Sequence, residues 1–299
     1  MFNEHKHNMK KIFILLFTQL ALCCTSFDAN YLTFTAEEDN SSFCIEDHNI
    51  KSNIFYSLDN GKTWKQLTDQ PVSLEKGDRA LLKGGEPDPK PSKENYSRFI
   101  IQGAIAASGS VMSLVDGDGE SKTIPYDDCF CRLFKDCSSL TKAPELPATT
   151  LATSCYCNMF YGCKSLIQAP ELPATTLAYG CYYGMFRECT SLKQAPKLPA
   201  TTLAERCYRL MFSGCTSLRQ APELPATTKT EGCYEGMFYG CENLSYIKVA
   251  FTDWGTGTDY WLGDVAENGT FICPKKLSIK YGENFIPKGW KIVNEDFNK

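Results

Sequence analysis

The sequence predicts a mixed, β-rich protein in which a solenoid of short strands and short helical turns follows a small antiparallel β domain. A 26-residue block recurs in register from Cys137 to Gly240. Runs of β-prone residues separated by turn residues precede it. The composition, 43% hydrophobic and 22% charged, is that of a folded protein. A repeat of this length builds a stacked array, because each unit has an apolar edge that only its neighbours can bury.

The repeat reads C-x-S-L-x-x-A-P-x-L-P-A-T-T, four variable positions, then C-Y-x-x-M-F-x-x. Copies start at Cys137, Cys163, Cys189 and Cys215, and 18 of the 26 positions are identical between the copies from Cys163 and Cys215. A degenerate copy spans residues 111–136, and remnants follow Cys241. These copies predict a solenoid over residues 111–250.

Within one copy, Leu166 and Leu172 are expected to face the core along and just after a short strand. Pro170 and Pro173 should interrupt the ladder at those points, because proline has no N–H to donate. The spacing of C-Y-x-x-M-F predicts a short helix or 3₁₀ turn. Phe186 is expected to stack with its equivalents as an aromatic spine: Phe160, Phe212 and Phe238.

Residues 27–110 carry strand signals for the β domain, and residues 84–95, rich in proline and charge, are expected to be an exposed excursion within it. The predicted strands are Tyr31–Thr35, Ile54–Ser57, Thr63–Leu67, Arg79–Leu82 and Phe99–Gly103. Residues 251–299 lack the repeat and contain two strand-like segments, Gly269–Cys273 and Trp290–Val293. We expect this region to cap the last exposed coil.

Residues 1–24 read as a signal peptide. Met9-Lys10-Lys11 precedes an apolar run from Ile12 to Cys24, which is shorter than the roughly 20 residues a bilayer span needs. Cys23 is the candidate for lipidation, as in a bacterial lipoprotein signal, although Leu22 is larger than the usual residue before the acylated cysteine. Ordinary secretion with removal of both cysteines is the alternative. We expect a secreted or cell-surface protein, held to the outer membrane only through such a lipid anchor.

Ten of the 16 cysteines fall into two columns of equivalent positions. Stacked equivalents would lie about 4.8 Å apart, with parallel Cβ vectors that suit a disulfide poorly. We therefore predict buried thiols. Cys131 and Cys157 lie outside both columns, at equivalent positions of adjacent copies, and are the disulfide candidates. The columns are Cys129, Cys155, Cys181, Cys207 and Cys233, and Cys137, Cys163, Cys189, Cys215 and Cys241.

Several features indicate a non-catalytic protein without metal or cofactor. The net charge of −4 makes nucleic acid an unfavourable partner. His48 is the one histidine outside the export signal. The segment Ser57–Trp64 matches the Asp-box of sialidase propellers, but a single copy favours a hairpin turn held by Asp59. Asp116–Glu120 resembles a calcium loop, yet Ser121 stands where an EF-hand requires glycine, which favours a solvated acidic turn.

The core M-F-x-x-C-x-S-L, followed by a proline-containing strand, resembles the BspA-like leucine-rich repeats of bacterial surface proteins, common in Bacteroidetes. The resemblance covers about Val111–Leu244. The A-P-x-L-P-A-T-T segment makes the unit longer than the commonest form of that family. The resemblance implies a curved, leucine-rich-repeat-like solenoid at the cell surface, associated with adhesion and host-protein binding, and it transfers no binding-site residue.

These features predict a secreted or cell-surface leucine-rich-repeat protein, an expected monomer, that mediates adhesion or binds a host or matrix protein. A carbohydrate-binding or glycan-handling surface lipoprotein and a structural spacer are the alternatives. The candidate contact residues stand at variable positions of different copies, and we expect them to form no fixed column. They are Tyr161, Tyr183, Arg187, Arg209 and Tyr239.

Overall fold

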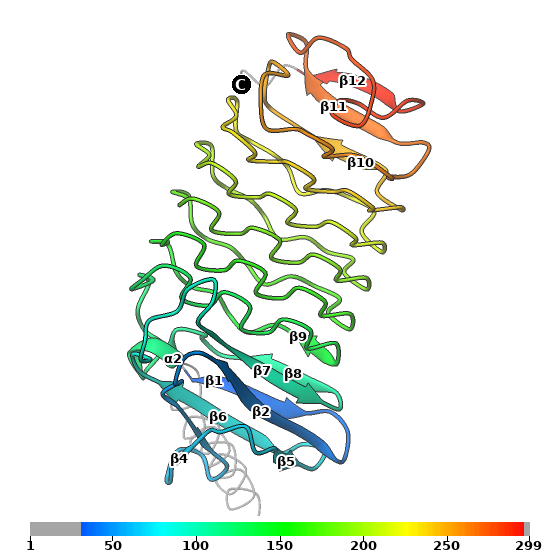
Figure 1. The fold of residues 1–299 in the computed structure, drawn as a ribbon. Helices are drawn as coiled ribbons and strands as arrows, with labels where there is room; N and C mark the ends of the chain where they lie inside the picture. The colour runs from blue at the N-terminus through cyan, green and yellow to red at the C-terminus, as the bar shows by residue number, and fades with distance from the viewer. Residues whose placement is uncertain (1–30, 296–299) are drawn as a thin grey trace, which may run out of the picture.

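The computed structural model describes residues 31–295 as a β domain followed by a stack of coils (Figure 1). The predicted β-rich class is confirmed, and within residues 31–295 the only α-helix is α2 (Ser113–Asp116). The eight strands of the β domain are β1 (Leu32–Ala36), β2 (Ser41–His48), β3 (Ile54–Ser57), β4 (Lys65–Gln66), β5 (Val72–Leu74), β6 (Arg79–Gly84), β7 (Tyr96–Gln102) and β8 (Ile105–Ser108).

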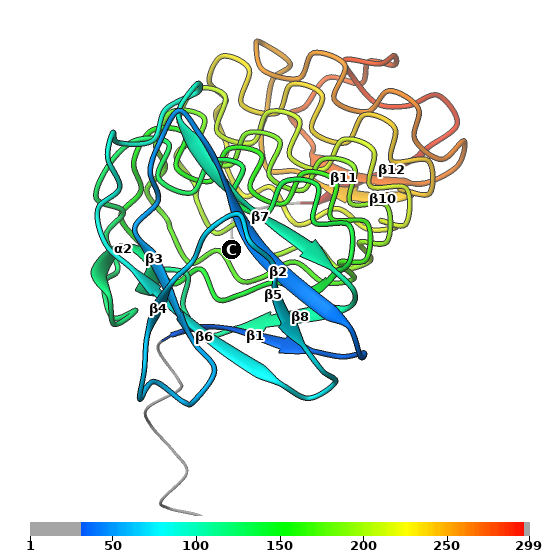
Figure 2. The same ribbon diagram turned by 60° about the horizontal axis from the view of Figure 1, so that its bottom comes forward.

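Antiparallel pairing arranges these eight strands in two sheets, with the orders β4-β3-β6-β1-β8 and β5-β2-β7. Figure 2 brings this domain forward, with β2 and β7 lying across β1, β6 and β8. Phe34 of the first sheet packs edge-on against Phe43 and Phe99 of the second, with centroids 5.1 and 5.0 Å apart. The predicted strands are present. Three strands were missed: β2 has polar residues at both ends, β5 is only three residues long, and β8 contains two alanines, which have low strand propensity.

The β domain continues into the stack without a break in the core. Strand β9 (Leu140–Lys142) belongs to the first full repeat copy and pairs in parallel with β8. The Phe99 N–H donates to Leu133 O at 2.8 Å, and the Cys137 thiol donates to Phe99 O at 3.1 Å. Strands β7 and β8 therefore cover the beginning of the stack, through bonds to Leu133, Cys137 and β9.

We number the coils from the cysteines that open them: coil 1 is residues 137–162, coil 2 is 163–188, coil 3 is 189–214 and coil 4 is 215–240, with residues 111–136 as the leading copy. Equivalent residues of adjacent coils lie one above the other. The Phe160 N–H donates to Met185 O, and the Phe186 N–H to Met211 O, both at 2.9 Å. The same bond joins the leading copy to coil 1 and coil 3 to coil 4. This ladder fixes the register at one repeat per coil.

The predicted aromatic spine is confirmed. The rings at repeat position 24 stack with centroids 5.4 to 5.7 Å apart in the order Phe134, Phe160, Phe186, Phe212, Phe238. A second column at position 20 runs beside it, with spacings of 5.7 to 6.1 Å, through Phe130, Tyr156, Tyr182, Tyr208 and Tyr234. Burying each of these side chains contributes roughly 2 to 3 kcal/mol.

The prediction of buried thiols is confirmed for nine of the ten column cysteines, and Cys129 is half-buried. Every cysteine of residues 31–295 is a free thiol. From Cys163 onward, each thiol at position 1 donates to the phenylalanine carbonyl 29 residues earlier, as in Cys163 Sγ to Phe134 O at 3.1 Å. Burial raises their pKa, that of Cys241 to about 12. Cys131 and Cys157 share a side-chain hydrogen bond but are not joined, so the disulfide expected there is absent.

The short helix predicted for C-Y-x-x-M-F is absent, and of the alternative, a 3₁₀ turn, only single turns closed by bonds three residues back are present. This segment is a run of tandem turns in which positions 18, 22 and 26 are left-handed. Alternate N–H groups donate across to the next coil, as from Tyr182 to Cys207 O, while those between them donate three residues back, as from Tyr183 to Gly180 O. A continuous helix would use all its N–H groups internally and leave the coils unlinked.

The proline-containing segments form little regular strand. Coil 1 has β9, whereas coils 2 and 3 meet only at the parallel bridge Gln168↔Gln194. The Ala169 N–H donates to Gln194 O at 3.1 Å, and the ladder ends at the prolines that follow, as predicted.

Residues after Ala250 continue the stack although the sequence repeat is lost. Strands β10 (Tyr246–Lys248), β11 (Thr270–Pro274) and β12 (Lys291–Glu295) form a parallel sheet. Each of three indoles donates to a carbonyl 24 residues away: Trp254 to Ser278 O, Trp261 to Phe285 O and Trp290 to Ala266 O. Large aromatic side chains thus replace the repeated residues in holding these turns together.

The Asp-box is a hairpin turn between β3 and β4. Asp59 accepts hydrogen bonds from the Thr63 N–H at 2.8 Å, the Thr63 hydroxyl at 2.6 Å and the Ser57 hydroxyl at 2.7 Å. Gly61 supplies the positive φ of 81° that closes the turn. The bonds to Thr63 and Ser57 hold the pKa of Asp59 well below its usual range, so this carboxylate is engaged in holding the turn.

Deleting one coil should be tolerated, because the bonds across each junction are the same. Removal of residues 189–214 joins Glu188 to Cys215 in unchanged register, and we expect a single cooperative thermal transition by circular dichroism. Deletion of residues 189–201 should give insoluble or molten protein, because it sets the proline-containing segment against the tandem turns. Equal loss of structure in both deletions would contradict a stack in which each coil contacts only its neighbours.

Alanine at a left-handed position should be destabilising. Gly184 has φ +57°, and a Cβ there would overlap Asn158 Oδ1. Gly184→Ala is expected to lower the free energy of unfolding by about 1 to 2 kcal/mol, measured by urea denaturation. Gly85→Ala is the control, since its φ is not left-handed and its nearest contact is the Asn53 amide at 3.1 Å. Similar losses in both variants would mean that backbone conformation is not the cause.

Asp59→Ala should lower the melting temperature at neutral pH. Because the folded-state pKa of Asp59 is lowered, its stabilisation is complete above the unfolded pKa of about 3.9 and is lost as pH falls through the lower folded value. The difference in melting temperature between wild type and variant should therefore shrink below about pH 4. A difference that grows on acidification would show that the carboxylate is not the stabilising form.

Candidate functional site

The five candidate contact residues form two columns on one face of the stack. Position 25 of successive copies holds Lys135, Tyr161, Arg187, Ser213 and Tyr239, and position 21 holds Cys131, Cys157, Tyr183, Arg209 and Glu235. The two positions are four residues apart in a segment whose turns repeat every four residues, so their side chains share one side. We call this surface the outer face. The expectation that these residues form no column is wrong, because the coil register superimposes equivalent variable positions.

Cations and tyrosine rings alternate along the outer face. The Tyr161 ring lies between Lys135 Nζ, 5.5 Å from its centroid, and the Arg187 guanidinium, at 5.6 Å. Arg209 lies 5.7 Å from the Tyr183 centroid, and its Nη2 is 2.7 Å from Glu235 Oε1. Each arginine is therefore held against the ring of the coil before it, and its planar group is pre-oriented.

Exposure differs along the face. Tyr161, Tyr183, Arg187 and Arg209 are half-buried, whereas Tyr239 is 44% exposed. A hydrogen bond to Asp264 raises the pKa of Tyr239. The outer face is thus ordered in coils 1 to 3 and more open at coil 4.

A further tyrosine–arginine pair escaped the sequence analysis. Tyr179, 42% exposed, accepts a hydrogen bond from Arg206 Nη1 at 3.0 Å, and Arg206 lies 3.6 Å from Glu231. The two residues are 27 positions apart, one coil plus one residue, so a search for equivalent positions does not pair them. This pair widens the outer face at coils 2 and 3.

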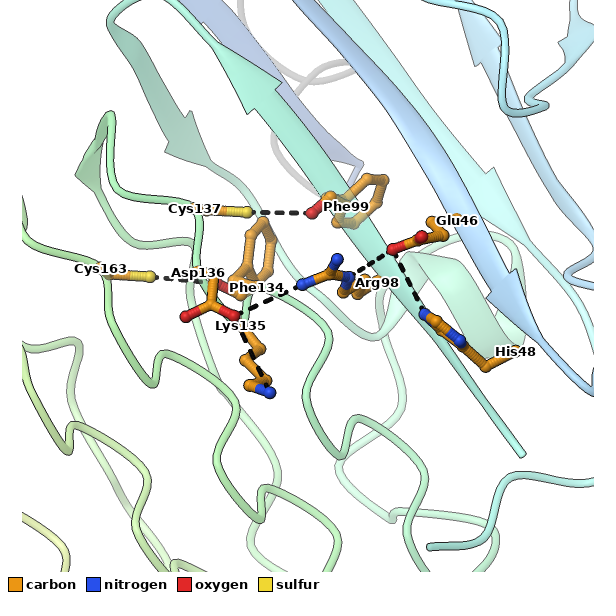
Figure 3. Close-up of polar contacts among 9 residues, drawn as sticks. All are labelled: Glu46, His48, Arg98, Phe99, Phe134, Lys135, Asp136, Cys137 and Cys163. Atoms are coloured by element: carbon orange, nitrogen blue, oxygen red, sulfur yellow. Dashed lines mark hydrogen bonds and ion pairs between the residues drawn. The ribbon is translucent and has the colours of Figure 1, made fainter. Parts of the chain in front are cut away.

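An ionic network attaches the outer face to the β domain (Figure 3). Arg98 of β7 places Nε 2.5 Å from Glu46 Oε2 and Nη1 3.4 Å from Asp136 Oδ2. Lys135, the first residue of the position 25 column, is 3.8 Å from the same Asp136 oxygen. The hydrogen bond from Arg98 lowers the pKa of Glu46. The column therefore begins at charged groups that the β domain holds in place.

The groups that sequence analysis weighed for chemistry have structural roles. His48 stacks on Tyr96 with centroids 4.4 Å apart, and its Nε2 lies 3.2 Å from Glu46. Asp116 accepts hydrogen bonds from the N–H groups of Asp118, Gly119 and Ser121, which close the acidic turn. Residues 31–295 contain no cluster of three or more histidine, cysteine or acidic side chains that could hold a metal ion.

A groove runs along the proline-containing segments of the coils, about half a coil away in sequence from the outer face. Two adjoining cavities of about 820 and 660 Å³ share Gln168, Ala169 and Glu171. Prolines of positions 8 and 11 form their floor, and Lys193, Lys197 and Glu223 are among the charged residues at the larger one. Sequence analysis missed this groove, although the repeated prolines marked its position.

The lipidation candidate Cys23 and the predicted signal peptide lie outside the described residues. Within residues 31–295, no helix has the length and apolar character that crossing a bilayer requires. No protein-family model, curated protein or solved structure matches this chain.

Proposed function

We propose that this chain is a non-catalytic, secreted or surface-displayed protein whose leucine-rich-repeat-like solenoid, belonging with the BspA-like repeats that it resembles, binds a host or matrix protein through the outer face. The observation that carries the proposal is the alternation of tyrosine rings and arginine guanidinium groups over Tyr161, Arg187, Tyr183 and Arg209. Tyrosine and arginine are the residues most enriched at the energetic centres of protein interfaces.

The pattern of variation within the repeat supports this choice of surface. Positions 20, 23 and 24 are identical in all four full copies and are buried, whereas positions 21 and 25 change in almost every copy and, except for the buried Ser213, are partly or fully exposed. Because the residues that set the register are constant and the residues of the outer face vary, the outer face can differ from copy to copy without disturbing the core. The held arginines also lose little conformational freedom on binding, which favours affinity.

Glycan binding, the first alternative, is less well supported by the same contacts. Sugars stack on the open face of an aromatic ring, but cations occupy both sides of Tyr161 and lie against Tyr183. A structural spacer, the second alternative, would not need an ordered row of tyrosine and arginine. A membrane enters the proposal only through the N-terminal lipid anchor, and we expect the protein to act as a monomer.

The test compares two matched surface variants by surface plasmon resonance against a panel of extracellular matrix proteins, beside a glycan array. Arg187→Ala with Arg209→Ala removes two cations from the outer face, and Lys193→Ala with Lys197→Ala removes two from the groove. For a matrix protein that wild type retains, the first variant should bind roughly tenfold or more weakly. The groove variant should bind as wild type does.

The other outcomes distinguish the alternatives. Loss of binding in the groove variant alone would place the site in the groove. Retention of glycans without any protein would favour the carbohydrate-binding alternative, and no retention of either class would favour a spacer. Thermal melting of both variants separates lost contacts from lost structure, because the cation–ring contacts also stabilise adjacent coils.

A further inference from the structure

Two thiols head the position 21 column, where the leading copy meets coil 1. Cys131 is buried, 3% exposed, and Cys157, directly above it, is half-buried. The Arg132 N–H donates to Cys157 O at 2.9 Å, so the coil register places the two cysteines side by side, and a hydrogen bond between their side chains shifts the pKa of both. The other cysteines of residues 31–295 belong to the position 1 and position 19 columns or lie apart in the core, as Cys44 and Cys273 do. None of them has this arrangement. The position is thus a two-thiol site that reaches the surface through Cys157.

The surroundings of the pair favour a thiolate on Cys157. The Asn158 amide Nδ2 lies 3.2 Å from Cys157 Sγ and donates to it. The hydrogen bond from Cys131 is the largest cause that lowers the pKa of Cys157, and the positive charges of Arg132 and Lys93 lower it further, while burial and the Asp128 carboxylate oppose the shift. The same hydrogen bond, with burial, raises the pKa of Cys131.

Cys157 is the exception among the thiols of residues 31–295. Burial raises the pKa of the position 19 and position 1 thiols, including Cys129 and Cys189, so they remain protonated and unreactive. A thiolate is the nucleophile in sulfur chemistry, and such thiolates are found beside cations and hydrogen-bond donors at partly exposed positions. Geometry and surroundings therefore single out one cysteine.

We propose that Cys157 is a nucleophilic thiol that exchanges with low-molecular-weight disulfides and that Cys131 is its resolving thiol. This inference is independent of the binding function proposed above.

The exchange proceeds in two balanced steps. The Cys157 thiolate attacks one sulfur of the small disulfide, forms a mixed disulfide, and the departing thiolate takes up a proton. Cys131 then loses the hydrogen-bond acceptor that raised its pKa, gives up its proton, and attacks Cys157 Sγ. The second small thiol leaves with that proton. Two protein thiols are oxidised, one small disulfide is reduced to two thiols, and the new bond joins the leading copy to coil 1.

The test treats the reduced full-length chain with oxidised glutathione at pH 7 and follows each cysteine by peptide mapping after acid quenching. In wild type, the Cys131–Cys157 disulfide should be the first product among residues 31–295. Cys131→Ser should stop at a glutathione adduct on Cys157, and Cys157→Ser should leave Cys131 unmodified. Cys129→Ser, which removes a nearby half-buried thiol, is the control and should react as wild type does.

A second variant tests the surroundings without removing a thiol. Asn158 has a left-handed φ of 50°, and coils 2 and 4 have glycine at the equivalent position, so Asn158→Gly removes the amide donor without strain. Adduct formation at Cys157 should slow severalfold, up to roughly tenfold. Modification of Cys129 before Cys157, or no adduct on Cys157 in the folded Cys131→Ser variant, would overturn the proposal. An unchanged rate in Asn158→Gly would also count against it.

Discussion

The backbone hydrogen bond from position 24 of one coil to position 23 of the next is the constraint on which the rest of the structure depends. It is made with the same length at every junction from the leading copy to coil 4. Because it sets the offset at one whole repeat, phenylalanine stacks on phenylalanine and each position 1 thiol reaches the same carbonyl. The buried columns are thus consequences of the register.

The bond requires a left-handed backbone conformation at every fourth residue, and the repeat provides it at positions 18, 22 and 26. Alternate N–H groups must point along the stack, which tandem turns with a left-handed residue every fourth position allow. Glycine or asparagine adopts this conformation at little cost. Leu210 and Glu188 adopt it as well, which shows that the neighbouring coils determine the local conformation where intrinsic preference opposes it.

Register also converts sequence differences between copies into contacts. A tyrosine in one copy and an arginine in the next become a cation–ring pair, and two cysteines become a thiol pair. The order of the copies in the sequence therefore determines which side chains are neighbours on the outer face. Its first residues are fixed by Arg98, Glu46 and Asp136 (Figure 3), so the β domain both covers the end of the core and orients the surface beside it.

The amino-acid sequence by itself determined the β-rich class, the 26-residue period, the buried thiols and the Phe186 column, because each follows from an apolar pattern repeated at constant spacing. It also located most strands of the β domain. The tandem turns, the two columns of the outer face, and the continuation of the stack through Trp254 and Trp261 were decided only by tertiary structure. The physical reason is that these features depend on hydrogen bonds and ring contacts between residues about one coil apart, whose partners are known only once the register is set.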